Sequence, residues 1–500
     1  MVDPRSHMLL LLLSVAASVS AQYNEAWHVL LPDPMYSGED LLLHADGALT
    51  VSGTSCFTAR YDGLGNAVWQ TDSLLADTFG FCIKLLPTMD GGTCALGDYE
   101  DHTGTDNLVG FHQDNGGALL GTAIVNTPGT NTGDEFHDAA QDSEGNIYLT
   151  GEFALNFNGA AGLAKLDPNG NLLWQVVLPP PPSWGFGQGY AVCCAGDTLI
   201  YVLARNTIGC SLLRYTAEGI LAGSTDLDVY IADNSNAFAV DAEGNAVFGG
   251  NHGNQFNITK VLADGTVLWS HDITYPGLSA ASSYISNIAC DGSGNIYAAG
   301  SAGSLQYGLL TKFSPTGIQL WADTTETYYP VPNYLARNRD RLLLHGDRLT
   351  LATIYVAAHL YEYDTLGDRL SRQALIVDGN TSPRVNAMRK DDDDNLYITG
   401  FIPSGQTYVG FLAKYAPDLS TTVQERTGVR PVIYPDPCID RLRVKDLPEG
   451  TAVEVEDANG RTVLHGSLHA GALDVGRLPD GPYLIRIPNG GSARFVKVGR

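Results

Sequence analysis

The sequence is poor in basic residues. It holds 29 Lys and Arg against 55 Asp and Glu, which gives a formal net charge of -26 over 500 residues. Nucleic-acid-binding proteins carry clustered positive charge that neutralises phosphates. The charge balance therefore argues against a nucleic-acid partner, and solubility is the simplest use of this acidity.

Methionine is scarce, and the chain has few of the Glu- and Lys-rich stretches that are typical of helices. Five Met stand against 56 Gly and 24 Tyr, and the latter two favour turns and strands. The hydrophobic content of 44% is ample for a core, and 500 residues usually hold more than one domain. We expect two β-rich domains with almost no helix.

Long apolar runs are also missing. The short run MLLLLLSVAASVSA, residues 8–21, falls below the roughly 20 residues that span a bilayer. It follows Arg5 and ends in small residues, with Val19 and Ala21 at the minus-three and minus-one positions of a cleavage site. We predict a signal peptide over residues 1–21, cleavage before Gln22, and no transmembrane segment in the mature chain.

Local catalytic motifs are absent. The sequence contains no H-E-x-x-H metal spacing and no G-x-S-x-G nucleophile elbow. Paired carboxylates for glycoside cleavage remain open, because in a repeat protein they would come from different repeats and show no local spacing.

A ten-residue pattern recurs along the chain. Its clearest copies read DSEGNIYLTG, DAEGNAVFGG, DGSGNIYAAG and DDDDNLYITG and begin at positions 142, 241, 291 and 391, with looser copies at 44, 88, 194 and 344. A second element follows each copy, as in GLAKLDPNGNLLWQ at 162. The eight copies recur at intervals of roughly 44 to 54 residues, and such periods are typical of propellers and other repeat arrays.

Within each copy, short alternating strands are separated by Asp, Asn and Gly clusters, the pattern of tight hairpins. Ile147 to Thr150 is one such strand. Four strands per copy make a sheet that cannot bury both faces alone, and radial stacking of sheets about an axis solves this problem. The sequence therefore predicts an all-β fold with an eight-bladed β-propeller.

The eighth copy runs through GFLAKYAPDL at 410 and then lacks a fourth strand with tryptophan. The isolated segment Glu25 to Leu31 supplies one, so we predict that an N-terminal strand closes the last blade. Alternatively, Trp27 is an ordinary buried aromatic in an N-terminal strand. On the first interpretation, five tryptophans share one structural role: Trp27, Trp69, Trp174, Trp269 and Trp321.

The element DPNGNLLW, with its glycine four residues before the tryptophan, resembles the tryptophan-docking repeats of the PQQ-like (quinoprotein-like) propellers. The resemblance covers roughly residues 24 to 420. It implies the fold and says little of function, because many propellers of this repeat class bind no cofactor.

Two segments are candidate cofactor sites. Asp391 to Asp394 offer clustered carboxylates for Ca²⁺, but these positions form a hairpin turn in the other copies, which favours a solvated turn. Cys193 and Cys194 resemble the adjacent disulfide that packs on the quinone in PQQ-dependent alcohol dehydrogenases. The calcium-binding set of that family is not evident here, which favours two strand cysteines or a disulfide from one of them to Cys210. We expect no cofactor, with Ca²⁺ and PQQ as the weaker alternatives.

The blade pattern stops in a polar linker, and a second pattern begins near Val432. We assign residues 22–420 to the propeller, 421–431 to the linker and 432–500 to a small Ig-like β-sandwich, because alternating strands with Asn-Gly and Asp-Gly turns fill the last segment.

This C-terminal segment resembles the type A sorting domain of the type IX secretion system. The residues that carry the resemblance are Tyr434, Pro435, Pro437, Asp440, Leu442, Gly460, Arg461, Gly481, Tyr483 and Lys497. The resemblance implies export to the periplasm, then passage across the outer membrane through the type IX machinery. The protein would be secreted or attached to the cell surface.

We therefore expect a monomeric exported propeller that acts as a binding or scaffold module for an extracellular glycan or protein. Its site would lie on the loops of one face or in the central channel. The alternative is a secreted enzyme on the same propeller, either a PQQ-type oxidoreductase or a polysaccharide lyase or hydrolase.

Overall fold

The computed structural model of the protein describes residues 23–32, 37–71, 80–100, 105–126, 133–155, 158–177, 187–206, 209–231, 237–252, 255–273, 284–302, 307–324, 341–345, 348–353, 359–404, 407–417, 433–434, 438–444, 450–457, 462–487 and 491–499. These residues form 39 β-strands. The predicted signal peptide lies outside the described residues. Within them, no helix has the length and hydropathy needed to cross a membrane.

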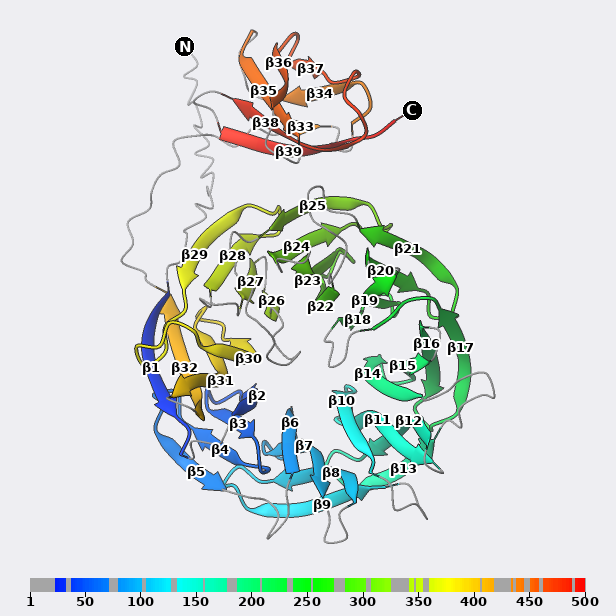
Figure 1. The fold of residues 1–500 in the computed structure, drawn as a ribbon, viewed down its shortest axis with the longest axis vertical. Coiled ribbons are helices and arrows are strands. Elements are labelled where there is room, and N and C mark those ends of the chain that lie inside the picture. The colour runs from blue at the N-terminus through cyan, green and yellow to red at the C-terminus, as the bar shows by residue number, and fades with distance from the viewer. Residues whose placement is uncertain are drawn as a thin grey trace, which may run out of the picture.

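Eight four-stranded antiparallel sheets follow one another around a ring (Figure 1). Blade 1 contains β2 (Gly38–Leu43), β3 (Leu49–Gly53), β4 (Thr58–Tyr61) and β5 (Ala67–Thr71); blade 2 contains β6 (Gly80–Pro87), β7 (Thr93–Glu100), β8 (Asp106–Gln113) and β9 (Leu119–Val125). Blade 3 contains β10 (Glu135–Gln141), β11 (Ile147–Leu155), β12 (Asn158–Leu166) and β13 (Leu172–Val177); blade 4 contains β14 (Gln188–Ala195), β15 (Leu199–Asn206), β16 (Gly209–Thr216) and β17 (Leu221–Leu227). In each blade the first strand lies innermost.

The same order continues in the second half of the ring. Blade 5 contains β18 (Phe238–Val240), β19 (Ala246–His252), β20 (Gln255–Val261) and β21 (Val267–Ile273); blade 6 contains β22 (Tyr284–Cys290), β23 (Ile296–Ala302), β24 (Tyr307–Phe313) and β25 (Gln319–Thr324). Blade 7 contains β26 (Arg341–His345), β27 (Arg348–Thr353), β28 (His359–Asp364) and β29 (Arg369–Ala374); blade 8 contains β30 (Arg384–Lys390), β31 (Leu396–Ser404), β32 (Thr407–Pro417) and β1 (Tyr23–Leu30). The prediction of an eight-bladed propeller is confirmed.

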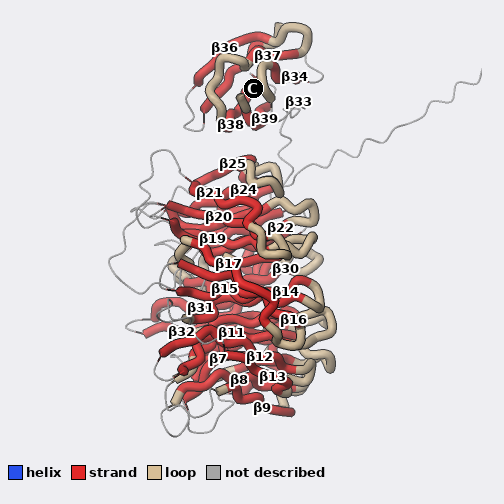
Figure 2. The backbone as a smooth tube through the Cα atoms, turned by 90° about the vertical axis from the view of Figure 1, so that its right-hand side faces the viewer, coloured by secondary structure: helices blue, strands red, loops and turns tan. Residues whose placement is uncertain are grey.

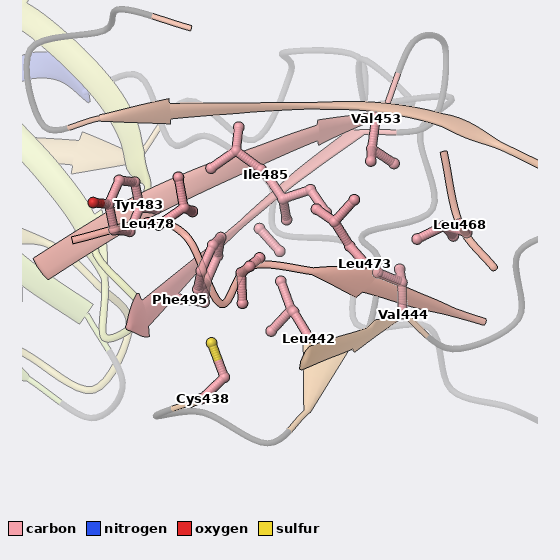
Figure 3. Close-up of a cluster of buried hydrophobic side chains, with 13 residues drawn as sticks. Cys438, Leu442, Val444, Val453, Leu468, Leu473, Leu478, Tyr483, Ile485 and Phe495 are labelled. Atoms are coloured by element: carbon pink, nitrogen blue, oxygen red, sulfur yellow. The ribbon is translucent and has the colours of Figure 1, made fainter. Parts of the chain in front are cut away.

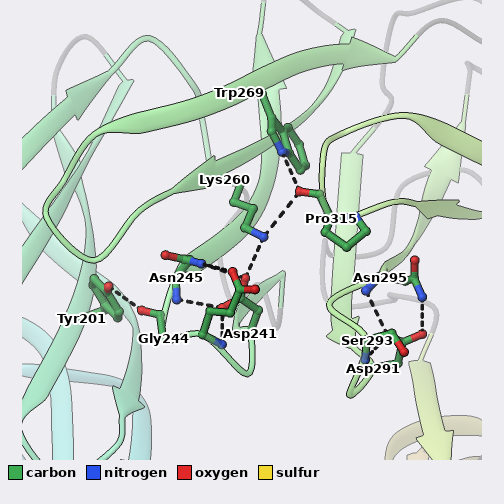
Figure 4. Close-up of polar contacts among 11 residues, drawn as sticks. Tyr201, Asp241, Gly244, Asn245, Lys260, Trp269, Asp291, Ser293, Asn295 and Pro315 are labelled. Carbon is green, nitrogen blue, oxygen red and sulfur yellow. Dashed lines mark hydrogen bonds and ion pairs between the residues drawn. The ribbon is translucent and has the colours of Figure 1, made fainter.

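Short turns, most of them with an acidic residue, join the first strand of a blade to the second and the third to the fourth, and they gather on one face of the ring (Figure 2). In blade 5, the Oδ1 atom of Asp241 accepts the backbone N–H groups of Glu243 at 3.0 Å and Asn245 at 2.9 Å. The Asn245 side chain donates to Oδ2 at 3.1 Å (Figure 4). Because one carboxylate satisfies the whole turn, the motif D-x-x-G-N encodes a hairpin wherever it recurs.

The N-terminal strand completes blade 8, as predicted. β1 pairs antiparallel with β32, and Trp27 lies opposite Lys414 and Leu30 opposite Phe411. After the strand, the backbone N–H of Leu31 donates to the Gly410 carbonyl oxygen at 2.8 Å. The first and last segments of the propeller therefore share one sheet.

Tyr23, the first residue of β1, also reaches the neighbouring blade 7. Its backbone N–H donates to Oε1 of Gln373 at 2.7 Å, and its hydroxyl donates to Oε1 of Glu362 at 3.0 Å. Glu362 is fully buried and forms an ion pair at 3.3 Å with Nζ of Lys390, which is equally buried. Buried ion pairs need further hydrogen bonds to offset desolvation, and Tyr23 supplies one of them.

The C-terminal segment forms two small sheets around a separate core (Figure 3). One sheet contains β33 (Ile433–Tyr434), β34 (Arg441–Val444) and β37 (Ala472–Asp474); the other contains β36 (Thr462–Ser467), β35 (Ala452–Asp457), β38 (Gly481–Ile487) and β39 (Gly491–Lys497). Leu442, Val455 and Ile485 are fully buried between them. The pattern of alternating strands thus produces the expected β-sandwich.

Deleting residues 22–32 should destabilise the propeller, because the chain loses β1 together with Tyr23 and Leu31, which are 1% and 3% exposed. Burial of these two side chains alone stabilises the fold by about 3 to 6 kcal/mol, and the uncovered β32 becomes an aggregation-prone edge. Thermal unfolding and light scattering measure both effects. Asn24→Ala, at an exposed position of the same strand, is the control and should behave like the parent; a deletion variant that melts like the parent and stays monomeric would disprove the closure.

Candidate functional site

The five predicted tryptophans lie on outermost strands and contact the turn of the next blade. In four cases the indole Nε1 donates to the carbonyl oxygen of the second turn residue: Trp27 to Gly63 at 3.3 Å, Trp69 to Asn115 at 2.9 Å, Trp269 to Pro315 at 3.2 Å and Trp321 to Thr365 at 3.3 Å. The Trp269 contact appears in Figure 4. Trp174 covers Gly219, where an added Cβ would lie 3.1 Å from the indole ring. Each tryptophan therefore joins two blades.

Two other side chains fill this position where the outer strand has no tryptophan. His112 of β8 covers Gly170 in blade 3, and the guanidinium of Arg214 in β16 covers Gly265 in blade 5. The Nη1 atom of Arg214 donates to the Ala263 carbonyl oxygen at 3.3 Å, the second turn residue as in the tryptophan contacts. Sequence reasoning missed both residues. Each lies on the third strand of its blade rather than on the fourth, and neither is a tryptophan.

The inner wall of the ring holds a series of charged side chains on successive first strands. The Oδ1 atom of Asp40 lies 3.1 Å from Nη2 of Arg389, which joins blades 1 and 8. Nζ of Lys84 lies 3.0 Å from Oδ1 of Asp138, which joins blades 2 and 3. Charges of alternating sign thus follow one another through blades 8, 1, 2 and 3.

The two carboxylates also bind backbone amides of the following blade. Oδ2 of Asp40 accepts the N–H of Leu85 at 2.9 Å, and Oδ2 of Asp138 accepts the N–H of Val192 at 3.1 Å. The Asp138 carboxylate raises the pKa of Lys84 against the opposing effect of burial, so the ammonium stays charged. Each inner strand has one edge without a neighbouring strand, and these carboxylates accept a backbone N–H group on that edge. We interpret this charged series as a set of contacts that hold neighbouring blades together.

A second polar cluster lies at the ends of β10 and β14 away from the hairpin turns. The His137 and Tyr190 rings have centroids 4.8 Å apart. Nη1 of Arg205 donates to the Tyr190 hydroxyl at 3.2 Å, and that hydroxyl donates to Oε1 of Gln188 at 2.5 Å. The His137 side chain is 6% exposed, its Nε2 lies 3.6 Å from Oε2 of the exposed Glu135, and its Nδ1 has no hydrogen-bond partner. We call these five residues the mouth cluster.

The candidate calcium segment, Asp391 to Asp394, forms a turn of the common type, as favoured from the sequence. Oδ1 of Asp391 accepts the N–H groups of Asp393 and Asn395 at 3.1 and 2.8 Å, while Oδ2 accepts Nδ2 of Asn395 at 2.8 Å and the Tyr397 hydroxyl at 3.0 Å. Its oxygens therefore bind donors of the turn itself and of the next strand. Within the described ranges, no group of three or more His, Cys, Asp or Glu is arranged to hold a metal ion.

The vicinal cysteines lie on opposite sides of blade 4. Cys193 belongs to a core cluster shared with blade 5, and its Sγ lies 3.8 Å from the Phe238 carbonyl oxygen. Cys194 packs instead beside Trp174 on the blade 3 side. All eight cysteines are thiols in the structure. Cys210 lies two strands away on β16 and level with Gln188, so both vicinal cysteines are beyond the Cα separation of a disulfide.

The structure describes most of the sorting-motif residues. Tyr434 of β33 pairs with Arg443 of β34. Asp440 precedes β34, and Gly481 begins β38. Leu442 lies in the core. Pro435, Pro437, Gly460 and Arg461 lie outside the described residues.

The last two motif residues hold the end of the sandwich together. The Tyr483 ring stacks on Phe495 with centroids 5.6 Å apart, and its hydroxyl donates to the Pro479 carbonyl oxygen at 2.9 Å. Nζ of Lys497 lies 3.5 Å from Oδ1 of Asp480. The G-x-Y and closing-strand segments therefore meet across neighbouring strands.

Comparison with known proteins agrees with both parts of this structure. Residues 432–498 match the family model of the secretion system C-terminal sorting domain. The C-terminal WD40 domain of Sif2 has a TM-score of 0.51 at 9% identity, over 78% of this chain and 98% of that chain. Sqt1 from Chaetomium thermophilum has a TM-score of 0.48 at 14% identity, over 79% of this chain and 99% of that chain. No curated protein matches the sequence.

A further structure is PorZ of Porphyromonas gingivalis, described as an essential bacterial surface component of the type-IX secretion system. Its TM-score is 0.34 at 11% identity, over 92% of this chain and 81% of that chain. The Sif2 match supports the propeller fold, and the resemblance to PQQ-like repeats stays a resemblance. The sorting domain defines a protein that is secreted or attached to the cell surface by the type IX route.

Gly117→Ala and Gly91→Ala form a matched pair that tests the tryptophan contact. Both glycines have positive φ, +84° and +81°, but a Cβ at Gly117 would lie 2.5 Å from Trp69 whereas at Gly91 the nearest atom is 3.9 Å away. Left-handed backbone costs either alanine about 1 to 2 kcal/mol. Overpacking should cost Gly117→Ala a further 1 to 3 kcal/mol, roughly. Urea unfolding measures the difference between the two variants. Equal losses of unfolding free energy would contradict the contact of Trp69 with the turn of the next blade.

Asp138→Ala should destabilise the ring by about 2 to 3 kcal/mol, because the Lys84 ammonium and the Val192 amide both lose their acceptor. Asp392→Ala, at an exposed position of an acidic turn, is the control and should stay within about 0.5 kcal/mol of the parent. Urea unfolding compares the two. If both variants unfold like the parent, the charged series does not fasten the blades.

Proposed function

We propose that the propeller is a binding or scaffold module that acts at the cell surface or in the medium, on a glycan or protein ligand. The contacts of the inner wall support this proposal. Its charged side chains bind one another and backbone amides of the next blade, so we assign them a structural rather than a catalytic role. A sorting domain that delivers the chain outside the cell supports an extracellular ligand.

We propose the mouth cluster as part of the ligand site. It combines an exposed carboxylate, a histidine nitrogen without a hydrogen-bond partner, a tyrosine hydroxyl and a guanidinium. Aromatic rings with hydroxyl, amide and charged groups nearby are suited to the polar and apolar faces of sugars and of peptide side chains. The cluster lies at the end of the inner strands opposite the hairpin turns, and the exposed Glu135 carboxylate is its accessible group.

A glycan array and an array of extracellular proteins, both probed with the full chain, test this function. Binding should weaken in Glu135→Ala and His137→Ala and stay unchanged in Asp392→Ala. A parallel oxidation assay with added PQQ and Ca²⁺ separates the alternative. Activity that appears only with both additions, with no binding on either array, would replace the binding module by an enzyme.

We further propose that residues 421–431 link two independent domains, so that removal of the sorting domain blocks export without unfolding the propeller. A chain that ends at Ser420 should accumulate in the periplasm of its native host with an unchanged melting temperature, because the residues recognised at the outer membrane are gone. Immunoblots of periplasm, surface and medium measure its distribution. Equal recovery of truncated and full chains outside the cell would contradict the sorting role.

A further inference from the structure

Two cysteines from neighbouring blades share one apolar cluster. Cys56 lies in the turn between β3 and β4 of blade 1, and Cys82 lies on β6 of blade 2. They are 1% and 0% exposed, and both belong to the cluster that includes Leu85, Val109 and Phe111. Buried cysteines are often small hydrophobic side chains and no more, so the pair needs evidence from the backbone.

The turn that carries Cys56 has an unusual sequence for its conformation. Ser55 and Cys56 have φ values of 59° and 51°, and the N–H of Phe57 donates to the Thr54 carbonyl oxygen at 3.2 Å. Two successive left-handed residues make a type I′ hairpin turn, which usually contains Asn-Gly. A cysteine in this conformation is strained, and the strain indicates a local contact that holds it.

That contact is with the first strand of blade 2. Thr54 forms an antiparallel bridge with Phe81, and a Cβ at Gly80 would lie 2.9 Å from Sγ of Cys56. The Cys56 Sγ lies 3.9 Å from the carbonyl oxygen of Asp98, which pairs with Phe81 across β6 and β7, and Cys56 and Cys82 pack in one cluster. The turn therefore places the Cys56 thiol against β6 of blade 2, the strand that carries Cys82.

The third cysteine of this region is too distant to compete. Cys82 pairs with Gly97 across β6 and β7, and Cys94 is three residues further along β7. Three residues of a strand span about 10 Å, whereas the Cα atoms of a disulfide lie within about 7 Å. The Cys94 Sγ instead lies 3.7 Å from the Cβ position of Gly110 and 3.9 Å from that of Gly170 in blade 3.

We propose that Cys56 and Cys82 form a disulfide during export, which links blade 1 to blade 2. The periplasm is oxidising. Two S–H bonds break and one S–S bond forms, while a disulfide-bearing periplasmic oxidant accepts the two electrons and two protons and becomes a dithiol. Burial, together with the neighbouring Cys56 thiol, raises the pKa of Cys82, so the Cys82 thiol of a finished ring is poorly reactive. The bond would therefore form before the blades close over it.

Peptide mapping of the full chain, isolated from the surface or medium of its native host, tests the bond directly. The protein is alkylated in denaturant without reductant and cleaved with trypsin. Arg60 and Lys84 place Cys56, Cys82 and Cys94 on three different peptides. We expect peptide 61–84 to be linked to the peptide that ends at Arg60, with Cys94 alkylated. Alkylation of both Cys56 and Cys82, or a link to Cys94, would overturn the proposal.

A stability comparison tests the same bond without mass spectrometry. The full chain directed to an oxidising periplasm should melt several degrees higher than the same chain made in a reducing cytosol. Cys56→Ala should abolish this difference, while the matched core variant Cys94→Ala should lower both values and keep the difference. A parent protein that melts identically from both compartments would contradict the disulfide.

Discussion

Closure of the ring depends on the pairing of β1 with β32, which joins the two ends of the propeller in one sheet. An antiparallel strand added at this edge satisfies backbone groups that would otherwise remain open to other chains. The same strand brings Trp27 onto blade 1 and Tyr23 onto the buried Glu362 of blade 7. One short segment thereby fastens blade 8 to both of its neighbours. The cost is a very long-range contact, which favours slow folding.

Neighbouring blades contact each other at two distances from the axis of the ring. At the outer radius, indole rings and two substitute side chains cover the glycine of the following turn. At the inner radius, Asp40 and Asp138 bind an amide of the following blade and a basic side chain nearby. Because both kinds of contact run from one blade to the next, the ring is held by repeated local contacts rather than by one continuous core. The proposed Cys56–Cys82 bond would add a covalent link to this scheme in blades 1 and 2.

Much of this architecture could be predicted from the sequence because it is encoded in short, repeated signals. The D-x-x-G-N turn and the glycine four residues before tryptophan are local, and the missing last strand of the eighth copy pointed directly to Trp27. The Tyr434 and Tyr483 segments identified the sorting domain in the same way.

Beyond the tryptophans, contacts between blades could not be predicted, because they leave no local period. His112 and Arg214 replace tryptophan from a different strand, and the position of Asp138 is taken by Asn287 in blade 6 and Ala387 in blade 8. The mouth cluster and the thiol pair similarly combine residues from two blades. Only the relative placement of the blades brings such groups together, and local patterns in a single sequence do not reveal that placement.

Hydrogen exchange of the amides in β32 tests the ring closure most directly. We predict that Thr407–Pro417 exchanges as slowly as β24, the equivalent strand of blade 6, which is flanked by strands on both sides. In both strands alternate amides face the outermost strand. Exchange of the β32 amides at the rate of an exposed edge, while β24 stays protected, would show that β1 does not close the propeller.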